Sequence, residues 1–95
     1  TITVTLDFLL DYYPSPDLVK IDVEGAENEV LQGGKRMLSV VRPMILLECE
    51  DYNALAATKI LHSNGYKLYN LENIDYGEIQ KCAFNTLCVP CPSPA

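Results

Sequence analysis

In the stretch Leu18 to Val23, every second residue from Val19 onward is β-branched and apolar, and polar residues lie between them. An alternation with a period of two predicts a β-strand with one buried face. Glu24 and Gly25 interrupt the pattern, and apolar residues then recur at helical spacing from Ala26 onward. A strand that turns through an acidic residue and a glycine into a helix is half of a βαβ unit. The rest of the chain is organised around this stretch.

The helix that begins at Ala26 should end or kink at Gly33-Gly34 and resume over Lys35 to Val41. The residue before a proline is biased towards extended geometry, so Arg42-Pro43 should lead directly into the next strand. That strand, Met44 to Leu47, is an uninterrupted apolar run. Such runs are typical of strands covered on both faces in a parallel sheet. The two strands should therefore run parallel, with one helix between them.

A second helix is predicted over about Asn53 to Ser63, with Gly65 in the left-handed conformation that commonly follows a helix. Tyr66 to Leu71 and Cys82 to Val89 are predicted as two further strands. No helix connects them, so they should pair antiparallel. The predicted fold class is α/β: two parallel strands plus an antiparallel hairpin in one sheet, with flanking helices.

The composition limits the kinds of partner. The chain has 95 residues, of which 48% are hydrophobic, and its net charge is −6. This length fits one domain or part of one. The negative charge argues against nucleic acid or an anionic membrane as a partner. No apolar run approaches the roughly 20 residues of a transmembrane helix. A further helix is expected over Thr5 to Tyr13, where leucines recur at helical spacing.

Four cysteines raise the question of disulfides or a metal site. Cys49, Cys82 and Cys88 lie in or beside strand-like segments and are interpreted as small buried hydrophobic residues. Cys88 and Cys91 have the spacing of a metal or redox pair, but a zinc site normally needs four ligands and the single histidine, His62, lies in a predicted helix. We therefore assign no metal. Free cysteines and the absence of a recognisable targeting segment favour a cytoplasmic location.

Acidic residues follow both predicted parallel strands. Asp22 and Glu24 end the first strand, and Glu48 and Glu50 end the second. Ligands of open parallel sheets bind beyond the carboxyl ends of the strands, and neighbouring strands are about 4.8 Å apart. The four carboxylates are thus expected at one rim, where they are either solvated loop acids or part of a polar substrate site. Their spacing is not diagnostic of Mg²⁺ or Ca²⁺.

The segment KIDVEGAENEVLQGG, followed by RPMILLE, closely resembles the C-terminal half of the FkbM-type methyltransferase domain. The flanking segments TVTLDFLL and FNTLCVP resemble that family in the same order. The resemblance spans Thr3 to Pro90, so residues 1–90 are expected to form a partial methyltransferase domain and residues 91–95 a frayed tail. It implies an S-adenosylmethionine-dependent O-methyltransferase on a Rossmann-like sheet, acting on a hydroxyl of a small molecule, lipid or sugar.

In this family the glycine-rich loop that holds the cofactor belongs to the N-terminal half of the domain, and the sequence shows no such loop. We therefore expect no turnover by the 95-residue chain alone. Methyl transfer to oxygen requires an acceptor hydroxyl held in line and a group that takes its proton. We expect Asp22 to take the proton and Glu24 to orient the Asp22 side chain. Glu48 and Glu50 are expected to bind the substrate.

Lys20 is unusual, because it is a charged residue inside an apolar strand. Its side chain either extends to solvent along its aliphatic stem or pairs with an acidic group. In the family pattern a lysine is common at this place, which favours structural pairing over a role as a base.

Two other functions compete with the enzyme. The first alternative is a non-catalytic α/β interaction module or a subunit remnant. It is suggested by the strand Leu18 to Val23, which would be an exposed apolar sheet edge that favours association. A metal-dependent phosphoryl-transfer site ranks last, since it needs a phosphate-binding loop or a basic cluster and the seven lysines and arginines are scattered.

Overall fold

The computed structural model describes residues 7, 9, 11, 14, 16–22 and 25–91. The strands are β1 (Leu18–Ile21), β2 (Met44–Glu48), β3 (Tyr66–Asn70), β4 (Glu78–Ile79) and β5 (Asn85–Pro90). The helices are α2 (Glu27–Gln32), the π-helix η1 (Met37–Val41), the short 3-10 helices η2 (Asp51–Asn53) and η3 (Ile74–Tyr76), and α3 (Ala54–Ser63). Most of the helix expected over Thr5 to Tyr13 lies outside the described residues, as do residues 23 and 24 and the tail 92–95.

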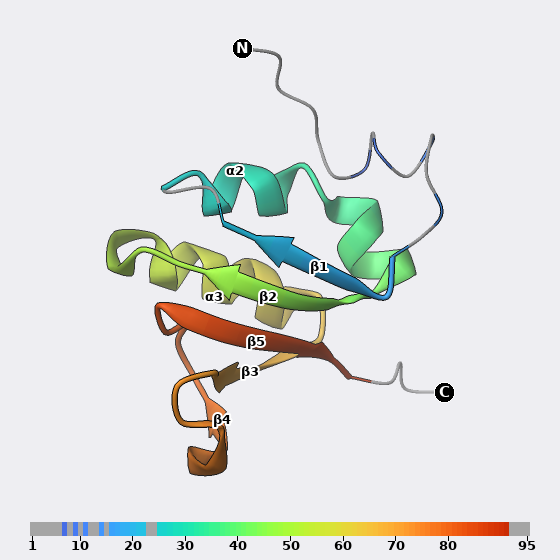
Figure 1. The fold of residues 1–95 in the computed structure, drawn as a ribbon. Helices are drawn as coiled ribbons and strands as arrows, with labels where there is room; N and C mark the ends of the chain where they lie inside the picture. The colour runs from blue at the N-terminus through green and yellow to red at the C-terminus, as the bar shows by residue number, and fades with distance from the viewer. Residues whose placement is uncertain are drawn as a thin grey trace.

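The strands form one sheet in the order β1-β2-β5-β3-β4 (Figure 1). β1 and β2 pair in parallel, from Leu18 opposite Met44 to Ile21 opposite Leu47, as predicted. β5 pairs antiparallel with β3, which confirms the predicted hairpin partners, and it also pairs antiparallel with β2. The last strand thus lies in the middle of the sheet, between β2 and β3. The α/β fold class is confirmed, and the mixed sheet is consistent with part of a Rossmann-like fold.

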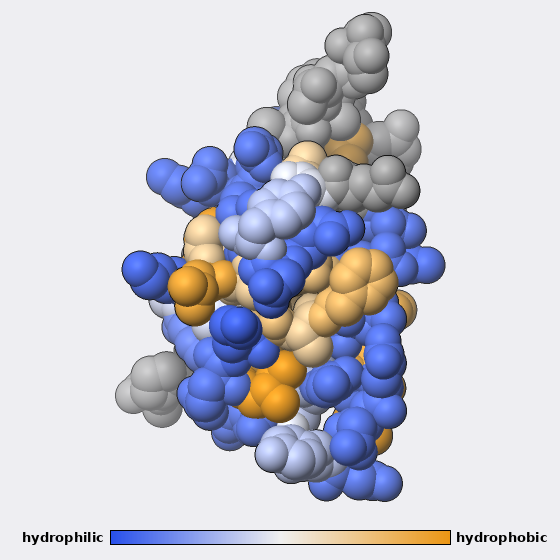
Figure 2. Space-filling model, turned by 90° about the vertical axis from the view of Figure 1, so that its left-hand side faces the viewer, coloured by the Kyte–Doolittle hydropathy of each residue, from blue (hydrophilic) through white to orange (hydrophobic). Residues whose placement is uncertain are grey.

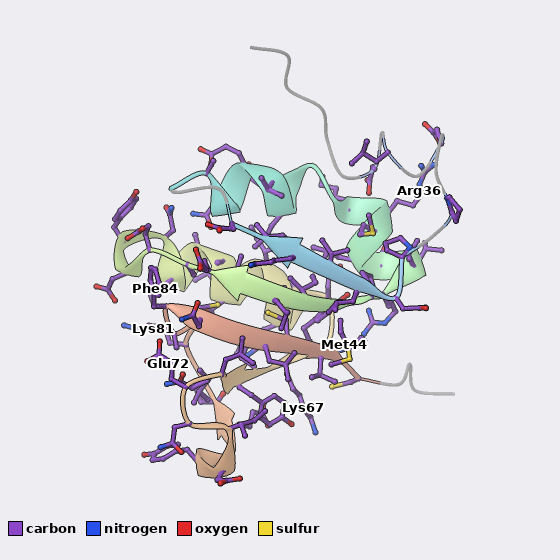
Figure 3. All side chains as sticks on the ribbon, viewed as in Figure 1. Arg36, Met44, Lys67, Glu72, Lys81 and Phe84 are labelled. Carbon is purple, nitrogen blue, oxygen red and sulfur yellow. The ribbon has the colours of Figure 1, made fainter. Side chains whose placement is uncertain are left out.

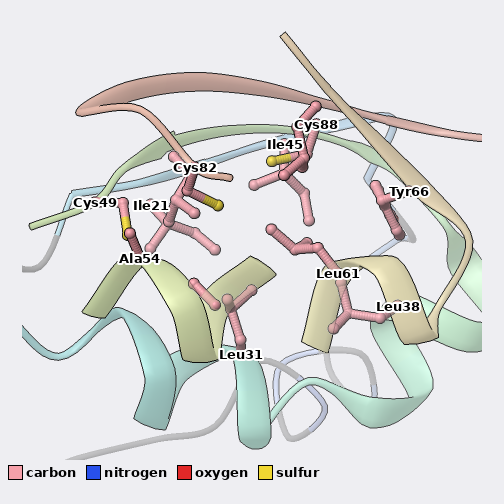
Figure 4. Close-up of a cluster of buried hydrophobic side chains, with 13 residues drawn as sticks. Ile21, Leu31, Leu38, Ile45, Cys49, Ala54, Leu61, Tyr66, Cys82 and Cys88 are labelled. Carbon is pink, nitrogen blue, oxygen red and sulfur yellow. The ribbon is translucent and has the colours of Figure 1, made fainter. Parts of the chain in front are cut away.

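The helices cover one face of the sheet, and the core lies between them and the strands (Figure 4). Every second strand residue points into this core, because side chains alternate along a strand. On β2, Ile45 and Leu47 are buried, whereas Met44 is 40% exposed. In the described part of the chain, no helix covers the other side, which we call the open face. The prediction that this strand is covered on both faces therefore holds for the helical face alone.

Helix α3 has the predicted packing face: Ala54, Ala57 and Leu61 are buried. Gly65 after its end has a φ of 74°, which confirms the left-handed conformation expected there. Thr58 is also buried, and this was not predicted. Its hydroxyl donates to the Ala54 carbonyl and accepts a hydrogen bond from the Cys82 backbone N–H at 2.9 Å. A single hydroxyl thus satisfies a backbone donor of the segment that leads into β5.

The helical segment after Gly33-Gly34 resumes, as predicted, and continues into η1. The Asp7 carboxylate accepts hydrogen bonds from the backbone N–H groups of Arg36 and Met37, each at 2.8 Å. The first backbone N–H groups of a helix have no partner within the helix, and a carboxylate near this positive end of the helix dipole stabilises the helix. Leu38 is buried as expected, and Val41 is half-buried.

Arg42 departs from the sequence-based prediction. Its φ and ψ are both 55°, the left-handed conformation, so the expected extended geometry at this residue is wrong. The guanidinium donates to four backbone carbonyls, those of Leu38, Asn64, Gly65 and Cys91, at 3.1, 2.5, 3.2 and 3.0 Å. It also lies 5.4 Å from the centre of the Tyr66 ring. Remote backbone groups therefore hold Arg42 in a conformation that its own proline neighbour disfavours.

Tyr66 completes this cluster. Its hydroxyl donates to the Pro43 carbonyl at 2.7 Å. Burial raises the pKa of Tyr66 to about 12, although the positive charge of Arg42 acts in the opposite direction. The phenol therefore stays protonated and remains a hydrogen-bond donor at neutral pH.

The cysteines are free, and Cys49, Cys82 and Cys88 are buried, as predicted. Burial raises the pKa of the Cys82 and Cys88 thiols above the ordinary value. A buried thiol with a raised pKa is a poor nucleophile, so these residues act as packing groups. Cys91 is half-buried, and His62 is exposed in the last turn of α3. Over the described ranges, no group of three or more His, Cys, Asp or Glu residues is arranged to hold a metal ion.

Candidate functional site

The carboxyl ends of β1 and β2 lie side by side and form the rim of the sheet. The last paired residues are Ile21 and Leu47, so one further step along each strand places Asp22 beside Glu48. Adjacent strands are about 4.8 Å apart, which brings the two residues to neighbouring positions. Asp22 is exposed and Glu48 is half-buried. Figure 2 looks onto this end of the molecule, where hydrophilic residues surround a smaller hydrophobic area.

Of the other two predicted site residues, the structure describes only Glu50. Glu24 lies outside the residues that the structure describes. Glu50 is half-buried just before η2, and its carbonyl accepts the Asn53 backbone N–H at 2.9 Å. The structure thus brings Asp22 and Glu48 together by strand register, with Glu50 two residues beyond the end of β2. Figure 3 shows Phe84, Lys81 and Glu72 at this end of the sheet, with Met44 and Lys67 towards the other.

A hydrogen-bonded tie joins the loop after β1 to the loop after β2. The Asn53 amide donates to the Gly25 carbonyl at 2.9 Å, and the Asn28 amide donates to the Asn53 side-chain oxygen at 3.1 Å. Sequence reasoning missed this tie, because it joins Asn53 to residues that lie 28 and 25 positions away in the chain. The tie holds Gly25 against Asn53, the last residue of η2.

Gly25 has a φ of 93°, a conformation that side chains with a Cβ rarely adopt. A Cβ at this position would lie 2.5 Å from the Tyr52 hydroxyl oxygen. The Tyr52 hydroxyl thus occupies the space that the absence of a Cβ leaves at Gly25. For this reason, we assign no cofactor-holding role to this turn.

Replacing Gly25 by alanine is expected to displace Tyr52 and to reduce stability. The positive φ costs an alanine about 1–2 kcal/mol, and the new Cβ occupies the place of the tyrosine hydroxyl. Gly77→Ala is the matched control, because Gly77 also has a φ of 93° but no described atom lies within 4 Å of the place that a Cβ would take. Both variants should lose stability in chemical denaturation, while Gly25→Ala alone should shift the NMR resonances of Tyr52. Unchanged Tyr52 resonances in that variant would contradict the packing described.

A pocket of about 210 Å³ lies behind the rim. We call it the Lys20 pocket; its lining residues are Lys20, Leu46, Leu47, Glu48, Leu71 and Asn85. Strand pairing explains this set: Lys20 is opposite Leu46, and Glu48 is opposite Asn85. The pocket combines an ammonium, a carboxylate and an amide with an apolar lining. Sequence reasoning noted the two charged residues but missed Leu71 and Asn85, because their position depends on β5 entering the sheet beside β2.

Lys20 is exposed, and no ion pair to it is found over the described ranges. Of the two interpretations of this lysine, the structure favours the one in which its side chain extends to solvent.

A family model for the FkbM methyltransferase domain matches residues 1–68 of this chain. The chain belongs to the FkbM methyltransferase family. Within this FkbM chain, Asp22, Glu48 and Glu50 all lie in the matched region, whereas Leu71 and Asn85 lie beyond it. Comparison with curated proteins finds no significant match, and comparison with solved structures finds none either. Over the described residues, no helix of this FkbM chain is long and apolar enough to cross a membrane.

Proposed function

We propose that the complete protein is an S-adenosylmethionine-dependent O-methyltransferase and that its acceptor hydroxyl is bound at the Asp22–Glu48 rim. The observation that supports the proposal is the parallel register of β1 and β2, whose last paired residues, Ile21 and Leu47, directly precede Asp22 and Glu48 in a chain of the FkbM methyltransferase family. Ligands of parallel sheets bind at this end of the strands. S-adenosylmethionine supplies an electrophilic methyl group when it is bound.

The rim residues have distinct roles in this proposal. Asp22 accepts the proton of the acceptor hydroxyl while the hydroxyl oxygen gains the methyl group, which is general base catalysis. Glu48 accepts a hydrogen bond from the substrate and holds it in line. Glu50 contributes to substrate binding, and Glu24 orients Asp22. The tie from Asn53 holds Gly25, three residues after Asp22, and fixed geometry contributes to the rate of a positioned bimolecular reaction.

The proposal is tested on the complete protein by calorimetric titration with S-adenosylmethionine and by transfer of a radiolabelled methyl group to hydroxyl-bearing acceptors. We expect saturable binding, competition by S-adenosylhomocysteine, and label recovered as a methyl ether. The isolated 95-residue chain should give no transfer. A folded complete protein that binds neither compound would rule out the proposal.

A second candidate is a non-catalytic association module that pairs through β1. The observation that favours it is the position of β1 at the end of the strand order, with Leu18 55% exposed. A strand with an unpaired edge is a template for pairing with another chain. A monodisperse monomer at high concentration in analytical ultracentrifugation would argue against this candidate.

A further inference from the structure

The Lys20 pocket presents one positive charge in an otherwise acidic neighbourhood. The chain carries a net charge of −6, and the rim beside the pocket contains Asp22 and Glu48. The Lys20 ammonium faces a pocket that is partly lined by leucines. Apolar walls lower the local dielectric constant, which strengthens the attraction between the ammonium and an anion. The pocket is therefore suited to a ligand with one anionic group.

The distance from Lys20 to the rim defines a second feature of that ligand. Lys20 and Asp22 are two residues apart on β1. A strand rises by about 3.3 Å per residue, so their Cα atoms are separated by about 7 Å along the strand. A ligand whose anion meets Lys20 thus extends a few bonds before it reaches the carboxylates of Asp22 and Glu48. Leu46 and Leu71 provide an apolar surface beside that path.

The lining residues favour a carboxylate over a phosphate. Phosphate sites usually combine an arginine fork, several donors or a helix N-terminus, whereas this pocket is lined by a single lysine and no arginine among the described residues. Glu48, which lines the same pocket, would repel a doubly charged phosphate more strongly than a singly charged carboxylate. A carboxylate carries one charge, which Lys20 balances.

We propose that the methyl acceptor is a hydroxy acid. Its carboxylate pairs with the Lys20 ammonium, its carbon skeleton packs on Leu46 and Leu71, and its hydroxyl lies at the rim beside Glu48 and Asp22. Asn85 has a fixed orientation there, because its amide donates to the Glu72 carboxylate at 2.9 Å. This assignment rests on the proposed methyltransferase function and adds the class of acceptor.

The test uses the complete protein with γ-hydroxybutyrate as the probe and γ-hydroxybutyramide as its neutral counterpart. Binding is followed by NMR of the leucine methyl groups, where the signals of Leu46 and Leu71 should shift with the acid. Lys20→Gln should weaken binding of the acid about tenfold, because an ion pair is lost, while affinity for the amide stays unchanged. Lys20→Arg should retain binding of the acid. Lys67→Gln is the matched control, since Lys67 is an exposed strand lysine far from the pocket (Figure 3).

Several results would overturn the hydroxy-acid assignment. Equal affinity for the acid and the amide would do so, as would unchanged binding of the acid in a folded Lys20→Gln protein or tighter binding of inorganic phosphate. Methyl transfer to neutral alcohols but not to hydroxy acids would also overturn it, while leaving the proposed methyltransferase function intact. In contrast, Lys20-dependent binding of the acid without any S-adenosylmethionine binding would support the carboxylate pocket and reject the methyltransferase.

Discussion

Replacing Asp22 by asparagine in the complete protein is expected to lower kcat for methyl transfer by about 10²–10⁴-fold, the range that a general base typically contributes. Asparagine has the same shape but accepts no proton. Asp22 is exposed, so the substitution should change the free energy of unfolding by no more than about 0.5 kcal/mol. Steady-state kinetics and thermal unfolding of the same preparation separate the two effects.

Asp51→Asn is the matched control for this experiment. Asp51 is an acidic residue beyond the end of β2 whose side chain is 97% exposed, and it forms a surface ion pair with Lys81 at 3.9 Å. Such a pair contributes little, so this variant should keep both its activity and its stability.

Glu48→Gln should mainly raise KM, because Glu48 is assigned to substrate binding. Unchanged turnover in Asp22→Asn, or an equal loss in Asp51→Asn, would remove Asp22 from the mechanism.

The second large effect is expected at Arg42. Replacing Arg42 by alanine should lower the free energy of unfolding by about 3 kcal/mol, because hydrogen bonds to a charged group contribute about 1.5–3 kcal/mol each and are not additive. The four carbonyls that it binds belong to η1, to the turn after α3 and to the residue after β5. The loss of these hydrogen bonds loosens all three segments at once. Urea denaturation followed by circular dichroism measures the change.

Arg42→Gly and Arg42→Lys separate the causes. Glycine adopts the left-handed conformation without strain, so Arg42→Gly should be about 1 kcal/mol more stable than Arg42→Ala. Lysine keeps the charge but lacks the planar fork with five donors, so Arg42→Lys should recover only part of the loss. An Arg42→Ala protein as stable as the unchanged chain would show that these hydrogen bonds have no net value.

The sequence predicted the features that depend on neighbouring residues. The alternation before Gly25 and the apolar run after Pro43 identified β1 and β2, and the helix between them implied the parallel pairing that places Asp22 beside Glu48. The sequence between Leu71 and Cys82 predicts no α-helix, which implied the antiparallel pairing of β3 and β5; the connection contains the three-residue η3 and the two-residue β4. Each of these inferences uses residues that are close in the chain.

The features that were missed depend on contacts between distant segments. The position of β5 between β2 and β3 is a choice among sheet orders that no local pattern encodes. Arg42 is left-handed because carbonyls up to 49 residues away bind its side chain, which overrides the rule for residues before proline. The Lys20 pocket was missed for the same reason, since Asn85 reaches it only through the pairing of β5 with β2.

The central position of β5 has a consequence for biosynthesis. A ribosome makes β2 and β3 before it makes residues 85–90, so both strands lack one pairing partner until β5 has been made. Unpaired strand edges on a growing chain are the surfaces that molecular chaperones recognise and that otherwise aggregate. The sheet can consequently be completed only after β5 has been translated, because this strand joins β1 and β2 to β3 and β4.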